Sequence, residues 1–158
     1  MPLNRLLLWA VIAFGLDRLS KLVIVEWMNL KERGVIIFLD PYLNFAMGWN
    51  RGINFGLFAD DAETAKWILI IVAFGISGWL FWWARRQSAR LIHIGAGLVI
   101  GGALGNVWDR FQYGAVADYL NMSCCGIRNP YTFNVADIFI FAGAALLIFA
   151  TNREDKKA

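Results

Sequence analysis

Four long apolar stretches occupy about half of this sequence and constrain what it can fold into. They run from about Leu6 to Val25, Trp67 to Ala84, Leu91 to Trp108 and Phe133 to Ala150. Each has roughly 18 to 20 residues, which is the length that an α-helix needs to cross a bilayer. In a chain of 158 residues, 59% hydrophobic and 17% charged, they predict an all-α membrane protein. We expect four transmembrane helices in a single domain over residues 1–158.

The first stretch begins like a secretory signal peptide, because Arg5 precedes its apolar run. Its downstream flank does not fit that interpretation. No small-residue cleavage site comes next; Asp17, Arg18 and Lys21 appear instead, and apolar residues then resume as far as Val25. We therefore expect this stretch to remain in the protein as its first crossing.

Basic residues in the connections predict how the helices are oriented. Arg85, Arg86 and Arg90 lie between the second and third stretches, and Lys156 and Lys157 lie in the C-terminal tail. The positive-inside rule places both regions in the cytoplasm, so the N-terminus is expected there too. The connection between the first two stretches and the one between the last two then face outward.

The long outer connection contains two runs of strand-forming residues. They are Gly34–Leu39 and Leu43–Met47, and Asp40-Pro41 and Gly48 punctuate them as turn signals. A small sheet or hairpin lying on the membrane is the predicted structure.

Three glycines recur every fourth residue along the third stretch. Gly97, Gly101 and Gly105 would give its helix a smooth face, against which a neighbouring helix can pack closely. Plain packing explains this stripe better than chemistry does.

Unusual polar residues gather where the stretches meet the outer side. An ionisable group inside a span is costly, so each one calls for a partner or a purpose. Asp17 and Lys21 are four residues apart and could form an ion pair that orients a site. The other members of this set are Asn50, Gly52, Asn106, Asp109, Arg110, Asp118, Asn134 and Asp137.

Asp118 and Asp137 are the candidate catalytic pair. Neither has a basic residue at helical spacing, and the chain between them is long enough to bring one carboxylate back to face the other. Two carboxylates held close together cannot both ionise comfortably, so one keeps a proton. Such a pair can activate a water molecule and protonate the leaving nitrogen, as an aspartic protease does.

Other hydrolytic chemistries have little support in the sequence. The single histidine, His93, lies near the cytoplasmic start of the third stretch, on the wrong side for a serine triad. The His-Glu-x-x-His pattern of a metalloprotease is absent, so no metal is expected. Cys124 and Cys125 lack the spacing of a zinc site or a disulfide framework, and no chemistry is assigned to them.

Two rival functions come from other classes of protein. A small proton- or cation-coupled transporter subunit would use intramembrane carboxylates, but it predicts polar groups throughout the depth of the membrane and broken helices. A structural scaffold would explain the glycines and leave the asparagines and aspartates without a purpose. The net charge of +3 does not imply a nucleic-acid partner.

Five sequence blocks resemble the lipoprotein signal peptidases, also called signal peptidase II, along nearly the whole chain. Arg18 stands where the family often has glutamine, and residues 121–131 follow no family pattern. The blocks are Asp17-Arg-Leu-Ser-Lys21, Asn50-Arg-Gly-Ile-Asn-Phe55, Gly101-Gly-Ala-Leu-Gly-Asn-Val-Trp-Asp-Arg110, Val116-Ala-Asp-Tyr119 and Phe133-Asn-Val-Ala-Asp137.

The resemblance implies a role for each candidate residue. Asp118 and Asp137 would be the catalytic dyad. Asp17, Lys21 and Asp109 would support it. The residues implied to bind or position substrate are Asn50, Gly52, Asn106, Arg110 and Asn134.

The resemblance also implies a fold and a reaction. It implies four transmembrane helices with an extracytoplasmic β-cradle and a short interfacial helix, in the bacterial cytoplasmic membrane. The reaction would remove the signal peptide of a diacylglyceryl-modified prolipoprotein just before its lipidated cysteine, without a cofactor. Membrane lipids and globomycin-type inhibitors are further expected partners, and a monomer is the expected state.

Overall fold

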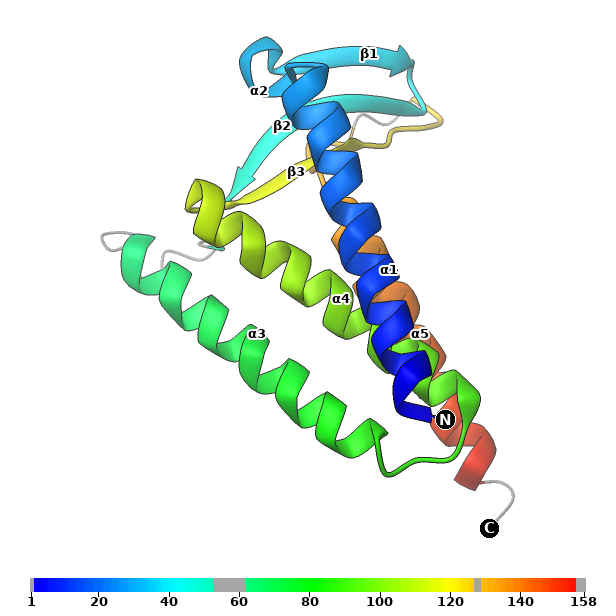
Figure 1. Cartoon of the computed structure of the whole chain (residues 1–158). Coiled ribbons are helices and arrows are strands. Elements are labelled where there is room, and N and C mark those ends of the chain that lie inside the picture. The colour runs from blue at the N-terminus through cyan, green and yellow to red at the C-terminus, as the bar shows by residue number, and fades with distance from the viewer. Residues whose placement is uncertain (1, 53–61, 127–128, 156–158) are drawn as a thin grey trace.

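The computed structural model describes residues 2–52, 62–126 and 129–155, in which long helices carry a small sheet at one end (Figure 1). The π-helical turn η1 continues α1, and the short helix α2 follows it. The elements are α1 (Pro2–Lys21), η1 (Leu22–Trp27), α2 (Leu30–Arg33), β1 (Val35–Leu39), β2 (Leu43–Asn50), α3 (Ala62–Ala84), α4 (Arg90–Tyr113), β3 (Val116–Asn121) and α5 (Val135–Asp155).

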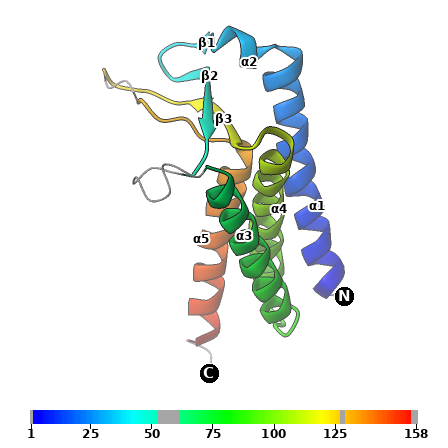
Figure 2. The ribbon, with the colours of Figure 1, turned by 90° about the vertical axis from the view of Figure 1, so that its left-hand side faces the viewer.

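Among the described residues, three helices are long and apolar enough to cross a membrane: Glu63–Ala84, Arg90–Tyr113 and Val135–Asn152. The middle one, α4, is the centre of the bundle, and α1, α3 and α5 all pack against it (Figure 2). Inside the protein, 61% of the apolar stretch of α4 is buried, against 22% in α3 and 17% in α5. The outer helices therefore turn most of their apolar side chains away from the protein. The α1 helix has 20 residues, with Arg18 and Lys21 in its last turn.

Glycines let the backbones around α4 approach closely. A Cβ atom at Gly97 would lie 2.5 Å from the carbonyl oxygen of Leu6 on α1. On another face of α4, a Cβ atom at Gly102 would lie 2.6 Å from the carbonyl oxygen of Ala136 on α5. The predicted packing role of the glycine stripe is thus confirmed, and its partner is α1.

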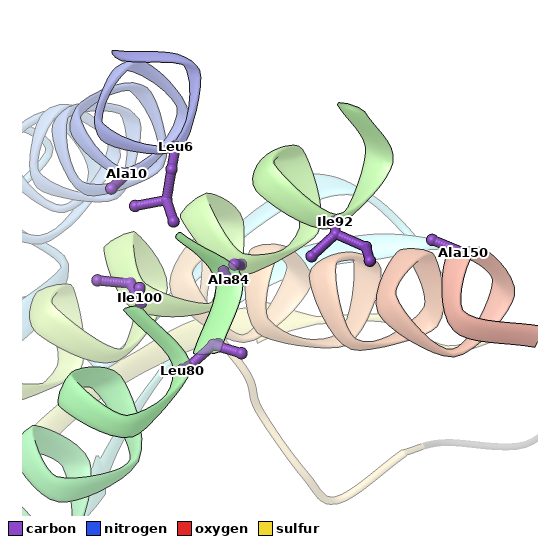
Figure 3. Packing of buried hydrophobic residues seen from close by; sticks show 8 residues of the cluster. Leu6, Ala10, Leu80, Ala84, Ile92, Ile100 and Ala150 are labelled. Atoms are coloured by element: carbon purple, nitrogen blue, oxygen red, sulfur yellow. The ribbon is translucent and has the colours of Figure 1, made fainter. Parts of the chain in front are cut away.

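An apolar core holds the helices together at the end that carries both termini. Figure 3 shows this cluster, to which α1, α3, α4 and α5 all contribute. Aliphatic and alanine side chains fill it. The polar residues of the candidate site lie at the opposite end of the bundle. The buried members of the cluster are Leu6, Ala10, Leu80, Ala84, Ile92, Ala96, Ile100 and Ala150.

The sheet caps the end of the bundle that lies away from the termini (Figures 1 and 2). Its strand order is β1-β2-β3, and both pairings are antiparallel. The predicted pair of strands is confirmed as β1 and β2, while β3 is a third strand where the sequence indicated only a connection. In the register of β2 and β3, Gly48 is opposite Asp118. Leu120 forms a further bridge with Phe133, just before α5.

Cys124 and Cys125 form a disulfide between neighbouring residues in the connection from β3 to α5. No disulfide was expected from their spacing in the sequence, so this bond is a correction. That expectation rested on frameworks that join distant segments, whereas this bond links adjacent residues. Both cysteines are exposed, and Cys125 has a φ of 59°.

Candidate active site

Asp118 lies on β3 with its side chain buried at the junction of the sheet and the bundle. Its exposed fraction is 5%. One carboxylate oxygen accepts a hydrogen bond from the Asn50 amide at 3.1 Å, and the other accepts one from the Asn134 amide at 2.6 Å. Strand pairing between β2 and β3 brings Asn50 to this position. The carboxyl group thus has donors from two separate segments of the chain.

Asp137 lies in the first turn of α5, where a reciprocal cap fixes it. The side-chain oxygen of Asn134 accepts the backbone N–H of Asp137 at 3.0 Å, and a carboxylate oxygen of Asp137 accepts the backbone N–H of Asn134 at 3.2 Å. This is the arrangement of a capping box, with asparagine at the N-cap and aspartate three residues later. The second carboxylate oxygen accepts from the Asn106 amide of α4 at 3.0 Å.

Asn134 connects the two carboxyl groups, which we call the dyad. Its amide nitrogen donates to Asp118 and also lies 3.3 Å from the side-chain oxygen of Asn106, the residue that donates to Asp137. Burial, and then the negative charge of Asp137, raise the pKa of Asp118 to about 6. The structure therefore brings Asp137 close enough for its charge to influence the ionisation of Asp118.

A buried cluster of four charges lies beside the dyad, where α1 meets α4. Lys21 is 2.9 Å from Asp17 and 2.7 Å from Asp109. Arg18 is 2.5 Å from Asp109. The pair of Asp17 and Lys21 was expected from the sequence, whereas Arg18 was missed as a fourth member. A basic residue next to Asp17, in an apolar stretch that the sequence predicts to cross the membrane, was the available signal, because such a charge needs a partner.

Gly52 and Arg110 flank the dyad from two other elements. Gly52 has a φ of 77°, its N–H donates to the side chain of Asn50 at 2.9 Å, and any Cβ atom there would collide with Leu69 on α3. Arg110 is partly buried on α4 and donates to the backbone carbonyl of Asn106 at 3.2 Å. Substrate contacts predicted for both residues remain predictions.

Other candidate chemistry lies elsewhere or is absent from the described part of the chain. His93 is fully buried near the start of α4, among residues at the end away from the sheet. In the described ranges no group of three or more histidine, cysteine or acidic side chains could hold a metal ion. The polar groups that the sequence singled out gather at one end of the helices.

This fold defines a class: membrane proteins with several apolar helices, a small capping sheet and a pair of carboxyl groups between them. Two solved structures share the fold. Both are described as bacterial membrane enzymes, solved by the in meso method at 2.3 Å and 1.9 Å resolution, and each is 24% identical to this chain. For the first structure the TM-score is 0.77, and the match covers 98% of this chain and 91% of the solved chain. For the second the TM-score is 0.78, and the match covers 94% of this chain and 92% of the solved chain.

Sequence comparison places the chain within that class. The model of the family described as Signal peptidase (SPase) II matches residues 9–153. A lipoprotein signal peptidase of Aeromonas hydrophila subsp. hydrophila is 41% identical and covers 95% of this chain and 90% of its own length. One from Methylobacterium sp. is 37% identical with the same coverage, and one from Nitrobacter hamburgensis is 36% identical and covers 94% and 92%. The chain belongs to the signal peptidase II family, and the transporter alternative finds no support.

Proposed function

We propose that this chain is an intramembrane aspartic endopeptidase that removes the signal peptide from diacylglyceryl-modified prolipoproteins, just before the lipidated cysteine. Membership of the signal peptidase II family supports the substrate class. The observation that carries the catalytic type is the amide of Asn134, which links Asp118 to the cap of Asp137. Asp17 and Asp109 are buried as well, but both are ion-paired with Lys21, and Asp109 also with Arg18.

The dyad would share one proton and cleave the peptide bond with water. The anionic carboxylate takes a proton from the water molecule, and the oxygen of that water attacks the carbonyl carbon. The protonated carboxyl group donates a hydrogen bond to the carbonyl oxygen. Collapse of the tetrahedral intermediate breaks the C–N bond, and a proton from the dyad goes to the leaving nitrogen. Burial and the charge of Asp137 raise the pKa of Asp118 to about 6, as expected for a pair that shares one proton. No step requires a metal or an organic cofactor.

Surrounding residues would orient the dyad and bind the substrate next to it. Asn50 and Asn106 orient one carboxyl group each through their amide donors. The guanidinium of Arg110 supplies donors for substrate carbonyls near the scissile bond. Gly52, whose positive φ suits glycine, places the loop backbone beside Asn50, where that backbone can approach the substrate.

We further propose that α1 crosses the bilayer with α3, α4 and α5, within one domain over residues 1–158. Two observations support both termini in the cytoplasm: α1 begins and α5 ends at the same end of the bundle, and Arg85, Arg86 and Arg90 join α3 to α4 at that end. The dyad and sheet then lie at the outer face of the bacterial inner membrane. A diacylated substrate enters sideways, with its acyl chains kept in lipid, and globomycin-type inhibitors compete for the same place. The sheet is the extracytoplasmic cradle, α2 the interfacial helix, and the working unit a monomer.

To test the proposal, the purified protein is incubated in detergent with a diacylated prolipoprotein. The released signal peptide is the readout. Asp118→Asn and Asp137→Asn should each abolish turnover, because an amide cannot take the proton of the attacking water. Both variants should still bind globomycin. The double variant should cost little more than either single one, since the two groups act as a unit. Near-normal turnover by either single variant would remove that aspartate from catalysis.

A further inference from the structure

Two carboxylates of the buried charge cluster bind the backbone directly beside the dyad. One oxygen of Asp109 accepts the N–H of Ala117 at 3.1 Å, and Ala117 is the residue before the first aspartate of the dyad. One oxygen of Asp17 accepts the N–H of Ala136, also at 3.1 Å, and Ala136 is the residue before the second. For each member of the dyad, a separate carboxylate therefore binds the backbone N–H of the residue before it.

These bonds join elements that are far apart in the sequence. Asp17 and Ala136 are separated by 119 residues and connect α1 to α5. The N–H of Ala136 belongs to the first turn of α5, where backbone donors lack partners within the helix and a negative charge is favoured. Asp109, Asp17 and both alanines are fully buried, so neither hydrogen bond competes with water.

The cations of the cluster pair with both acceptors. Lys21 contacts both carboxylates, and Arg18 contacts Asp109 through the oxygen that does not bind the backbone. Two positive and two negative groups balance, which makes burial of the set tolerable. Ser20 on α1 gives a second link to β3, the strand that carries Ala117, because its hydroxyl oxygen lies 2.5 Å from that of Tyr119.

We propose that Asp17 and Asp109 are positioning residues, each of which sets the location of one dyad aspartate through the backbone N–H of the residue before it. The proposal rests on the proposed function of the dyad. Neither residue would touch substrate. A displacement of about 1 Å in a reacting group can cost about a hundredfold in rate, so loss of either bond should lower kcat more than it raises KM.

The sharpest test isolates the backbone bond from the charge. Arg18→Gln provides the background, because its side-chain amide can pair with an amide at position 109 while the remaining charges of Asp17 and Lys21 balance. In that background Asp109→Asn keeps an oxygen for the N–H of Ala117, whereas Asp109→Ala removes it. Both double variants have the same net charge. Lys31→Gln, which breaks the exposed pair with Glu26, serves as the control for losing an ion pair at the outer surface.

The alanine double variant should show a kcat about tenfold or more below that of the asparagine double variant, with KM within about twofold. Hydrogen–deuterium exchange over residues 115–120 should be faster only in the alanine variant, and thermal unfolding identifies the folded fraction used for each rate. Equal kcat values and equal exchange in the two folded proteins would overturn the proposal. If the alanine protein does not fold, the same comparison is made with Asp109→Leu, which is close to asparagine in size and has no acceptor. Absence of cleavage by the unmodified protein would instead refute the proposed function, and the exchange measurement would still report on the backbone bond.

Discussion

Asn134 performs two tasks that are usually given to separate residues. Its oxygen caps α5 by accepting the N–H of Asp137, and its nitrogen donates to Asp118. The residue is fully buried, so neither bond can be replaced easily by solvent. Stability of a helix and alignment of the dyad therefore depend on the same amide.

Substitution of Asn134 should separate the two tasks. Asn134→Ser keeps an N-cap oxygen but loses the amide donor, and Asn134→Ala loses both. We expect the alanine variant to be about 1 kcal/mol less stable than the serine variant. Both should lose about ten- to a hundredfold in turnover, because a hydrogen bond to a charged group contributes roughly 1.5 to 3 kcal/mol. Thermal unfolding and cleavage assays measure the two effects, and full turnover by the serine variant would contradict the bridging role.

The pKa of Asp118 predicts how stability depends on pH. Burial and the Asp137 carboxylate raise that pKa from 3.8 to about 6, so the folded protein holds the proton more tightly than the unfolded chain. Stability should therefore fall as pH rises from about 4 to about 6, and the loss is complete above that range. Asp118→Asn cannot ionise and escapes the loss. Its melting temperature, relative to the unmodified protein, should rise between about pH 4.5 and about pH 8; a constant difference would contradict the assigned ionisation.

Individual site residues could be predicted from the sequence where both the residue type and its spacing from other residues indicated a function. Asp118 and Asp137 stood out because no basic residue could neutralise them along a helix. The capping box of Asn134 and Asp137 was missed, although its spacing of three residues is a known signature. The contact between Arg18 and Asp109 could not be predicted from the sequence. These residues are 91 positions apart, and only the packing of α1 on α4 brings them together.

Among the elements, α4 depends most on small residues. A Cβ atom at Gly101 would meet Ala13 and the backbone of Ala10 on α1, whereas one at Gly78 on α3 would meet nothing within 4 Å. Gly101→Ala should therefore destabilise the protein by about 1 to 3 kcal/mol through overpacking. Gly78→Ala should leave stability unchanged or raise it slightly, because alanine favours helix. Thermal unfolding in one detergent compares them, and equal effects would contradict close packing of α1 on α4.

The elements that hydropathy governs were predicted best. The apolar stretches located α3, α4 and α5 to within five residues at every end, and turn signals located β1 and β2. The strand β3 was missed because residues 116–119 are all buried, which hides the alternation of a surface strand. Its pairing with β2 depends on a sequence-distant partner, and that information is absent from the local pattern.

For the molecule as a whole, the distribution of charge predicts a topology that reporters can test. A reporter inserted after Gln87, in the basic connection between α3 and α4, should be active only if it functions in the cytoplasm. One inserted at Gly126, in the exposed connection from β3 to α5, should be active only if it functions outside. The reverse pattern would move the dyad to the cytoplasmic face and contradict the proposed site.

The arrangement of the dyad on β3 and α5 has a consequence for biosynthesis. Asp118 leaves the ribosome before Asp137, and the chain between them includes the connection that returns to the sheet. A nascent chain that lacks α5 has neither the second aspartate nor the amide of Asn134. On the proposed function, proteolytic activity would begin only after the last helix has been translated and inserted, so an unfinished molecule would pose no hazard to the other proteins passing through the same membrane.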